Sequence, residues 1–193
     1  MPATHRQDGL DSDLLAAIAS GEQSAFERLY KLYEQRVYQY VCTLVYDPPL
    51  AEEIVGDTML AIWRGAGTFA RTSRVSTWIF GIARHKALDA MRRTGRQQRE
   101  APLDEVVDQV HPQESPIEGV HRQQLAVVTQ QALAKLSREH QEVLRLVFYE
   151  DLPYDEIAGL LSIPPNTVKT RVYYAKQHLK QILERSEQKE PVR

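Results

Sequence analysis

The sequence predicts an all-α protein made of two small helical domains that are joined by an acidic flexible linker. Apolar residues recur at spacings of three and four along most of the chain, and no stretch shows the alternation typical of a strand. One long segment rich in proline, glycine and acidic residues interrupts this pattern. At 193 residues the chain is long enough for one ordinary domain or two small ones.

The interruption sets the domain boundaries. A structureless stretch of this length is uncommon inside one compact domain, so we place a linker there. The expected order is a flexible N-terminus (1–13), an N-terminal domain (14–96), the linker (97–119), a C-terminal domain (120–184) and a tail (185–193).

Four helices are expected in the N-terminal domain. Asp11–Asp13 can cap the first, and Ser24–Glu27 has the spacing of a capping box for the second, which Asp47–Pro49 stops. The aromatic residues of the second helix lie at helical spacing, so we interpret them as core rather than as a base-stacking surface. The helices are expected at Leu14–Ser20, from Phe26 to Val45, at Leu50–Arg64 and, after a basic glycine-containing loop (65–74), at Ser76–Arg93.

The C-terminal domain is expected to end in a helix-turn-helix. Two helices, Gln124–Leu136 and Arg138–Tyr149, precede it, and the second supplies the core residues Leu144, Leu146, Val147 and Phe148. A short amphipathic helix, Asp155–Leu161, is then broken by Ser162–Pro164, and Pro165 suits the first position of a basic second helix. Such a second helix fits the DNA major groove, although an ordinary helical hairpin with a solvated lysine face would share the pattern.

Charge is unevenly distributed along the chain, although the net charge is only −2. Residues 64–99 carry 9 basic and 1 acidic groups, and residues 164–183 carry 4 basic groups and no acid. Residues 100–118, between them, carry 6 acids and no base. Two basic islands separated by an acidic strip favour two separate contacts with a polyanion.

Enzyme chemistry and membrane insertion find little support. Three neighbouring carboxylates, Glu52, Glu53 and Asp57, indicate a solvated face or a protein-docking face rather than a metal or acid–base site, because no histidine accompanies them. His85 and Asp89 are four residues apart but lack a nucleophile or zinc partner. Cys42, the single cysteine, cannot form an internal disulfide and is expected to be a buried, inert thiol. No signal peptide or apolar run of about 18 residues is present, so we expect a cytoplasmic protein without enzyme activity, cofactor or membrane insertion.

Three motifs together resemble the extracytoplasmic-function (ECF) sigma factors of the bacterial sigma-70 family. Ala51–Arg64 is similar to region 2.2, which docks on the β′ clamp helices of RNA polymerase. Ser76–Arg93 is similar to regions 2.3–2.4, which open and read the minus-10 element. The helix-turn-helix is similar to region 4.2, which reads the minus-35 element. The order and spacing of the three motifs make the resemblance specific.

The resemblance implies three sets of site residues. Core-polymerase binding would fall to Glu52, Glu53, Asp57 and Thr58. Minus-10 DNA binding would fall to Arg71, Arg74, Trp78, Arg84, His85, Arg92 and Arg93. Minus-35 DNA binding would fall to Asn166, Thr167, Lys169, Thr170, Arg171 and Tyr174. The family commonly has asparagine, glutamine and arginine where this sequence has His85, Gly56 and Tyr174.

The implied function is that of a dissociable specificity subunit that recognises both promoter elements and melts DNA. The implied partners are core RNA polymerase (β′ clamp helices and β subunit), promoter DNA and an anti-sigma factor. A stand-alone helix-turn-helix repressor or activator is the alternative, and it would bind specific duplexes without polymerase. A DNA- or RNA-processing enzyme that uses Asp57, His85 or Asp89 is a third hypothesis, which predicts metal-dependent turnover.

Overall fold

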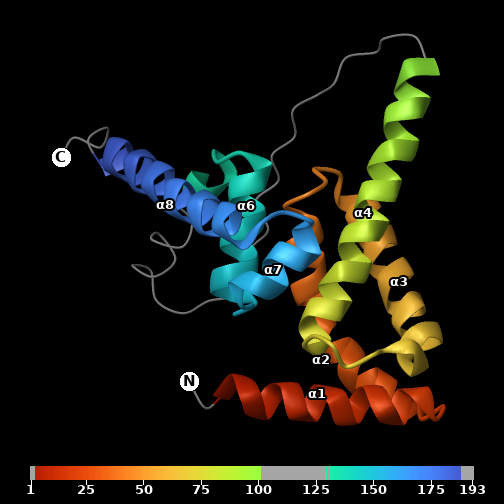
Figure 1. Ribbon diagram of the computed structural model, residues 1–193. Coiled ribbons are helices and arrows are strands. Elements are labelled where there is room, and N and C mark those ends of the chain that lie inside the picture. The colour runs from red at the N-terminus through yellow and green to blue at the C-terminus, as the bar shows by residue number, and fades with distance from the viewer. Residues whose placement is uncertain (1–2, 101–128, 130, 188–193) are drawn as a thin grey trace, which may run out of the picture.

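Helices account for all the regular structure of the part of the chain that the computed structural model describes, residues 3–100, 129 and 131–187 (Figure 1). The predicted all-α class is therefore confirmed. Most of the expected linker and the start of the expected helix Gln124–Leu136 lie outside the described residues.

The N-terminal helices form a four-helix unit. It consists of α1 (Ala3–Ala19), α2 (Gln23–Val41), α3 (Pro48–Gly65), the short 3-10 helix η1 (Ala66–Thr68) and α4 (Val75–Glu100). In Figure 1, α1 lies across the ends of the other helices, and α3 and α4 run side by side. The apolar face of α2 is central, since Leu29, Tyr33, Val37 and Tyr40 are fully buried. The interpretation of the α2 aromatic residues as core is confirmed for Tyr33 and Tyr40.

Four helix ends of the N-terminal unit differ from those expected. The first helix begins at Ala3 rather than Leu14, and Asp11 lies within it as a buried acceptor for the Tyr33 hydroxyl instead of capping it. The capping box does not form, because Ser24 lies inside α2 and its hydroxyl bonds to the Glu22 carboxylate. α2 ends at Val41, ahead of the expected stop at Asp47–Pro49. Just after this end, Thr43 donates to the Tyr40 carbonyl through both its backbone N–H and its hydroxyl. The α4 helix continues to Glu100, into the expected linker.

The C-terminal helices are α6 (Arg138–Leu144), the π-helical turn η2 (Arg145–Tyr149), α7 (Tyr154–Leu161) and α8 (Pro165–Glu187). Ser137 caps α6, since its side chain accepts a hydrogen bond from the His140 N–H. The π turn was not expected, and it corrects one core assignment. A wider turn shifts the helical phase, and Phe148 then faces solvent with 57% of its surface exposed.

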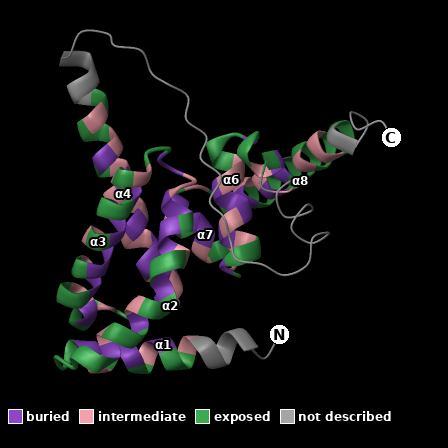
Figure 2. Ribbon diagram, turned by 180° about the vertical axis from the view of Figure 1, so that it is seen from behind, coloured by how far each residue is buried: buried purple, intermediate pink, exposed green. Residues whose placement is uncertain are grey.

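The two groups of helices pack against each other. Their buried side chains form one continuous cluster, and α4 contacts α7. Figure 2 shows the buried residues on the faces that α2, α4, α6 and α7 turn toward one another. The helix α8 extends away from this contact, so its outer face is exposed.

Candidate nucleic-acid interface

The helix-turn-helix is formed by α7, the turn and α8. Ser162 ends α7 in the left-handed conformation (φ 57°, ψ 44°), and the Ile163 N–H closes the turn on the Ala158 carbonyl at 3.0 Å. Pro165 then begins α8, as expected from its fixed φ and missing N–H. Val168 and Ala175 are fully buried against the rest of the domain, which leaves the opposite face of α8 open.

The expected minus-35 residues fall mostly on this open face. Asn166, Lys169, Thr170 and Tyr174 are exposed, whereas Thr167 and Arg171 are half-buried. The guanidinium of Arg171 lies 3.4 Å from the carboxylate of Glu139, in α6. Arg171 therefore lies at the edge of the open face, beside a carboxylate of α6.

Sequence reasoning missed an aromatic and basic hollow beside these residues. Its lining is Tyr154, Lys169, Val172, Tyr173, Lys176 and Gln177. The Lys176 ammonium lies 5.6 Å from the centre of the exposed Phe148 ring, and Tyr173 packs edge-on against Tyr174. Lys169, Tyr173 and Lys176 follow the spacing i, i+4, i+7, so the signal was present in the sequence. Rings and ammonium groups together suit nucleic-acid contact.

The expected minus-10 arginines on and just before α4 fall into two groups. Arg74 and Arg84 both point toward the C-terminal helices, where Arg84 bonds Glu142 at 3.0 Å and Arg74 lies 3.7 Å from Glu156. Arg92 and Arg93 are exposed further along the helix. Asp89 pairs with Arg92, and the Nδ1 of the exposed His85 contacts the Gly81 carbonyl.

Arg71 lies in the loop before α4, and Trp78 lies in the first turn of α4. Half-buried Trp78 packs at 5.5 Å on Phe69, and its ring lies close to Gly65. Arg71 is exposed and takes a left-handed backbone conformation with φ of 57°. The loop and the start of α4 therefore present an exposed cation and a half-buried aromatic ring, which are side chains that suit the phosphate and the base of an unstacked nucleotide.

The α3 helix carries the expected polymerase-binding residues, and one of the four is misplaced. Glu52 and Glu53 are exposed, and Asp57 lies 3.5 Å from Lys86 of α4. Thr58 is fully buried, and its hydroxyl donates to the Ile54 carbonyl, so the expectation that it contacts a partner is wrong for this structure. The same helix exposes the large apolar side chains of Leu60 and Trp63.

Metal-ion and membrane chemistry find no matching feature in the described ranges. No group of three or more histidine, cysteine, aspartate or glutamate side chains there could hold a metal ion. None of the described helices combines the length and the apolar character that a membrane span requires. Cys42 is half-buried, and burial raises the pKa of its thiol, which keeps it protonated and unreactive.

Comparison with known proteins gives matches over both helical units. The family model for sigma-70 region 2 matches residues 29–97, and that for sigma-70 region 4 matches residues 127–179. The ECF RNA polymerase sigma factor SigK of a Mycobacterium species (strain KMS) is 30% identical over 166 residues, covering 82% of this chain and 83% of SigK. The ECF RNA polymerase sigma factor BldN of Streptomyces coelicolor is 29% identical over 186 residues, covering 93% of this chain and 70% of BldN.

Solved structures agree at the level of the fold. The sigma factor RpoE, in complex with the anti-sigma factor NepR from Bartonella quintana, has a TM-score of 0.64 at 23% identity, covering 82% of this chain and 96% of that one. CnrH, in complex with the cytosolic domain of CnrY, has a TM-score of 0.62 at 23% identity, with coverages of 91% and 97%.

Proposed function

Because the chain belongs to the ECF sigma factors of the sigma-70 family, we propose that it binds core RNA polymerase and directs it to promoters. In this role the α8 face recognises the minus-35 element, and the loop and α4 recognise and melt the minus-10 element. The observation that carries the proposal is the separation of two basic surfaces, on α4 and α8, in two helical units of one chain.

Each basic surface supplies a different kind of contact. Exposed arginines and lysines bind phosphates irrespective of sequence and make binding sensitive to salt. Asn166, Lys169 and Thr170, near the start of α8, are exposed where a recognition helix meets base edges. Trp78, at the start of α4, supplies a stacking surface for a base of the melted strand. Two weak contacts on one tethered chain gain from effective concentration, so neither domain needs to bind tightly alone.

We assign polymerase docking to the exposed part of α3. Glu52, Glu53 and Asp57 supply its charge, and Leu60 and Trp63 supply apolar surface. An anti-sigma factor is a further proposed partner, since the fold neighbour RpoE was solved in complex with one. We also propose that the chain acts in the cytoplasm, with the polymerase, and that it catalyses no reaction of its own.

Reconstituted transcription tests the function directly. The protein is mixed with bacterial core RNA polymerase and a library of promoter fragments, and the transcripts are sequenced. Defined start sites with shared upstream elements, absent with core polymerase alone, are the expected result. If no complex and no start sites form while the protein alone binds specific duplexes, the proposed sigma-factor function is wrong. A stand-alone repressor is then the function that fits.

Charge reversal at Asp57 tests the docking face. The Asp57–Lys86 pair is exposed, with 45% and 38% of the two side chains accessible, and such pairs contribute about 0–1 kcal/mol to stability. Asp57→Arg should therefore fold normally, and its affinity for core polymerase should be lower by about tenfold or more. Asp13→Arg makes the same charge change on the exposed surface of α1 and should bind like the unsubstituted protein. Equal affinities of the two variants would remove α3 as the docking face.

A further inference from the structure

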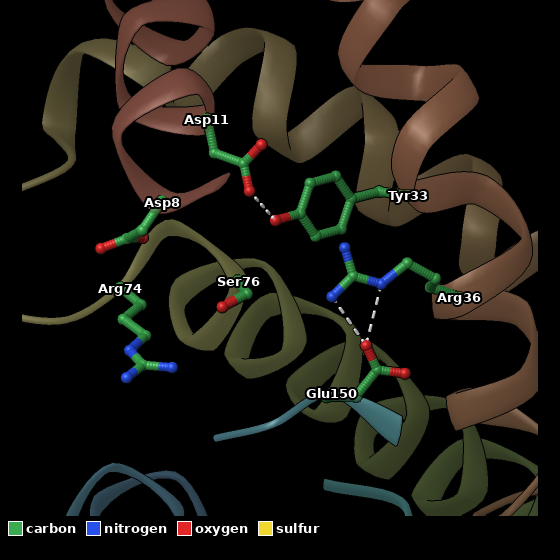
Figure 3. Close-up of a pocket in the computed structure, with 7 residues that line it drawn as sticks. All are labelled: Asp8, Asp11, Tyr33, Arg36, Arg74, Ser76 and Glu150. Atoms are coloured by element: carbon green, nitrogen blue, oxygen red, sulfur yellow. Dashed lines mark hydrogen bonds and ion pairs between the residues drawn. The ribbon is translucent and has the colours of Figure 1, made fainter. Parts of the chain in front are cut away.

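One buried polar atom of the described part of the chain has no hydrogen-bond partner. Figure 3 shows the usual arrangement, in which buried polar groups satisfy one another: Arg36 Nη2 lies 2.8 Å from Glu150 Oε2, and the Tyr33 hydroxyl donates to Asp11. The exception is Nδ1 of His140, in α6, which is buried and unpaired. A buried nitrogen without a partner loses the hydrogen bonds that water would supply, so its surroundings call for an explanation.

His140 faces a second histidine across the contact between α6 and α8. Its ring centre lies 5.1 Å from that of His178, and the two ring planes are inclined at 65°. His140 is half-buried near the start of α6, whereas His178 is exposed on α8. The two imidazoles, called here the histidine pair, therefore form one site with a buried side and an open side.

Burial and three neighbouring groups act on the charge of His140. Burial lowers its pKa, His178 and Arg171 lower it further, and Glu139 raises it. The Glu139 carboxylate also lies 3.4 Å from the guanidinium of Arg171, which offsets part of its negative charge. The surroundings of His140 therefore disfavour a proton on it in the free protein.

Other charges near the histidine pair are directed elsewhere. Arg138, also at the start of α6, has its guanidinium carbon 4.4 Å from the centre of the Tyr46 ring. Lys180 lies 3.6 Å from Glu184, the residue one turn further along α8. The α8 residues one turn from His178 are uncharged at neutral pH: Tyr174, Ala175, Gln181 and Ile182. A proton on the pair would therefore gain most from an anion that comes from outside the protein.

The histidine pair lies beside the proposed minus-35 surface. Arg171 and His178 are seven residues apart, so they share one side of α8, and both face residues at the start of α6. His178 lies about 10 Å beyond Arg171 along the helix axis. A recognition helix places its N-terminal residues on base edges, and the major groove is about 8.5 Å deep. Two turns beyond Arg171, the open side of the pair then lies at the level of the phosphates that border the groove.

We propose that the histidine pair binds a backbone phosphate of the minus-35 duplex and takes up one proton from water as it does so. The proposal rests on the minus-35 recognition proposed above for α8. A protonated imidazole donates through both ring nitrogens, and its hydrogen bond to a phosphate oxygen is charge-assisted. The proton belongs to the pair rather than to one ring, because the two groups interact.

Duplex and proton therefore favour each other's binding. The phosphate supplies the negative charge that the pair lacks in the free protein, and the proton strengthens the contact with the phosphate. Uptake of one proton changes the affinity by at most about tenfold per pH unit, and by less where the pair is partly protonated in both states. Affinity for duplex DNA should thus rise as pH falls, by about threefold or more between pH 8 and pH 6.

The test uses the full chain and a mixed-sequence duplex of about 20 base pairs at constant salt. Fluorescence anisotropy gives the dissociation constant at each pH, and NMR of labelled histidine side chains gives the titration midpoints of the pair with and without duplex. His178→Gln removes the open side of the pair, and His178→Lys places a fixed positive charge there. His5→Gln, in α1, removes a histidine from the N-terminal unit as the matched control. Circular dichroism at each pH checks the fold.

The unsubstituted protein and His5→Gln should bind the duplex about threefold or more tightly at pH 6 than at pH 8, and the midpoint of the pair should rise on binding. His178→Gln should lose most of this pH dependence. His178→Lys should bind at pH 8 about as tightly as the unsubstituted protein binds at pH 6.

Unchanged midpoints on duplex binding, or equal pH dependence in His178→Gln and His5→Gln, would overturn the proposal while leaving minus-35 recognition intact. A midpoint that rises with inorganic phosphate but not with duplex would also overturn it, since the site would then take free anions. If the duplex binds none of the proteins at any pH, minus-35 recognition by α8 fails together with the proposal.

Discussion

Thr58→Val separates the core of α3 from its docking face. Thr58 is fully buried, and its hydroxyl donates to the Ile54 carbonyl at 2.7 Å. In an α-helix the same carbonyl also accepts from the Thr58 backbone N–H, so valine leaves no acceptor unpaired. Losing one hydrogen bond costs about 0.5–1.5 kcal/mol, and the added buried methyl contributes about 0.8 kcal/mol in the opposite sense. We therefore expect the free energy of unfolding to change by less than about 1 kcal/mol.

The affinity for core polymerase tests the assignment of Thr58 more directly than the stability does. Thr58→Val should bind core polymerase with unchanged affinity, measured by fluorescence anisotropy of the labelled protein, while its neighbour Asp57→Arg binds weakly. Urea unfolding of both variants checks that their folds are intact. A folded Thr58→Val that loses about tenfold or more of its affinity would refute the reasoning, because it would require the hydroxyl to reach the polymerase.

Two further predictions concern the C-terminal helices. Ser162→Gly should raise the free energy of unfolding by about 0.5–1 kcal/mol, because glycine adopts the left-handed conformation at Ser162 without steric cost. Urea titration against Ser162→Ala measures this, and equal stabilities would contradict it. Burial and the facing His178 lower the pKa of His140. Arg171 also lowers this pKa, whereas Glu139 raises it. The unfolded chain therefore binds this proton more readily, so stability is retained above about pH 6.5 and falls as pH drops below it. His140→Gln should reduce that fall in pH-dependent thermal unfolding, whereas His85→Gln, on the surface of α4, should not.

Local chemistry made the helix-turn-helix predictable. Ser162–Pro164 cannot continue a helix and Pro165 can begin one, so the turn follows from neighbouring residues. The burial of Thr58 was also predictable from the sequence. Thr58 lies four residues after Ile54 and four before Ile62, so it shares their buried face. The resemblance to region 2.2 directed attention to Thr58 as a surface residue, and helical phase contradicts that assignment.

Two contacts between the N-terminal and the C-terminal helices could not be predicted in this way. Arg36 and Glu150 are 114 residues apart, and Tyr40 and Glu142 are 102 apart, so no local periodicity relates them. The π turn is a second case, because one wider turn changes which residues face inward without changing composition or spacing. Phe148 was assigned to the core for this reason.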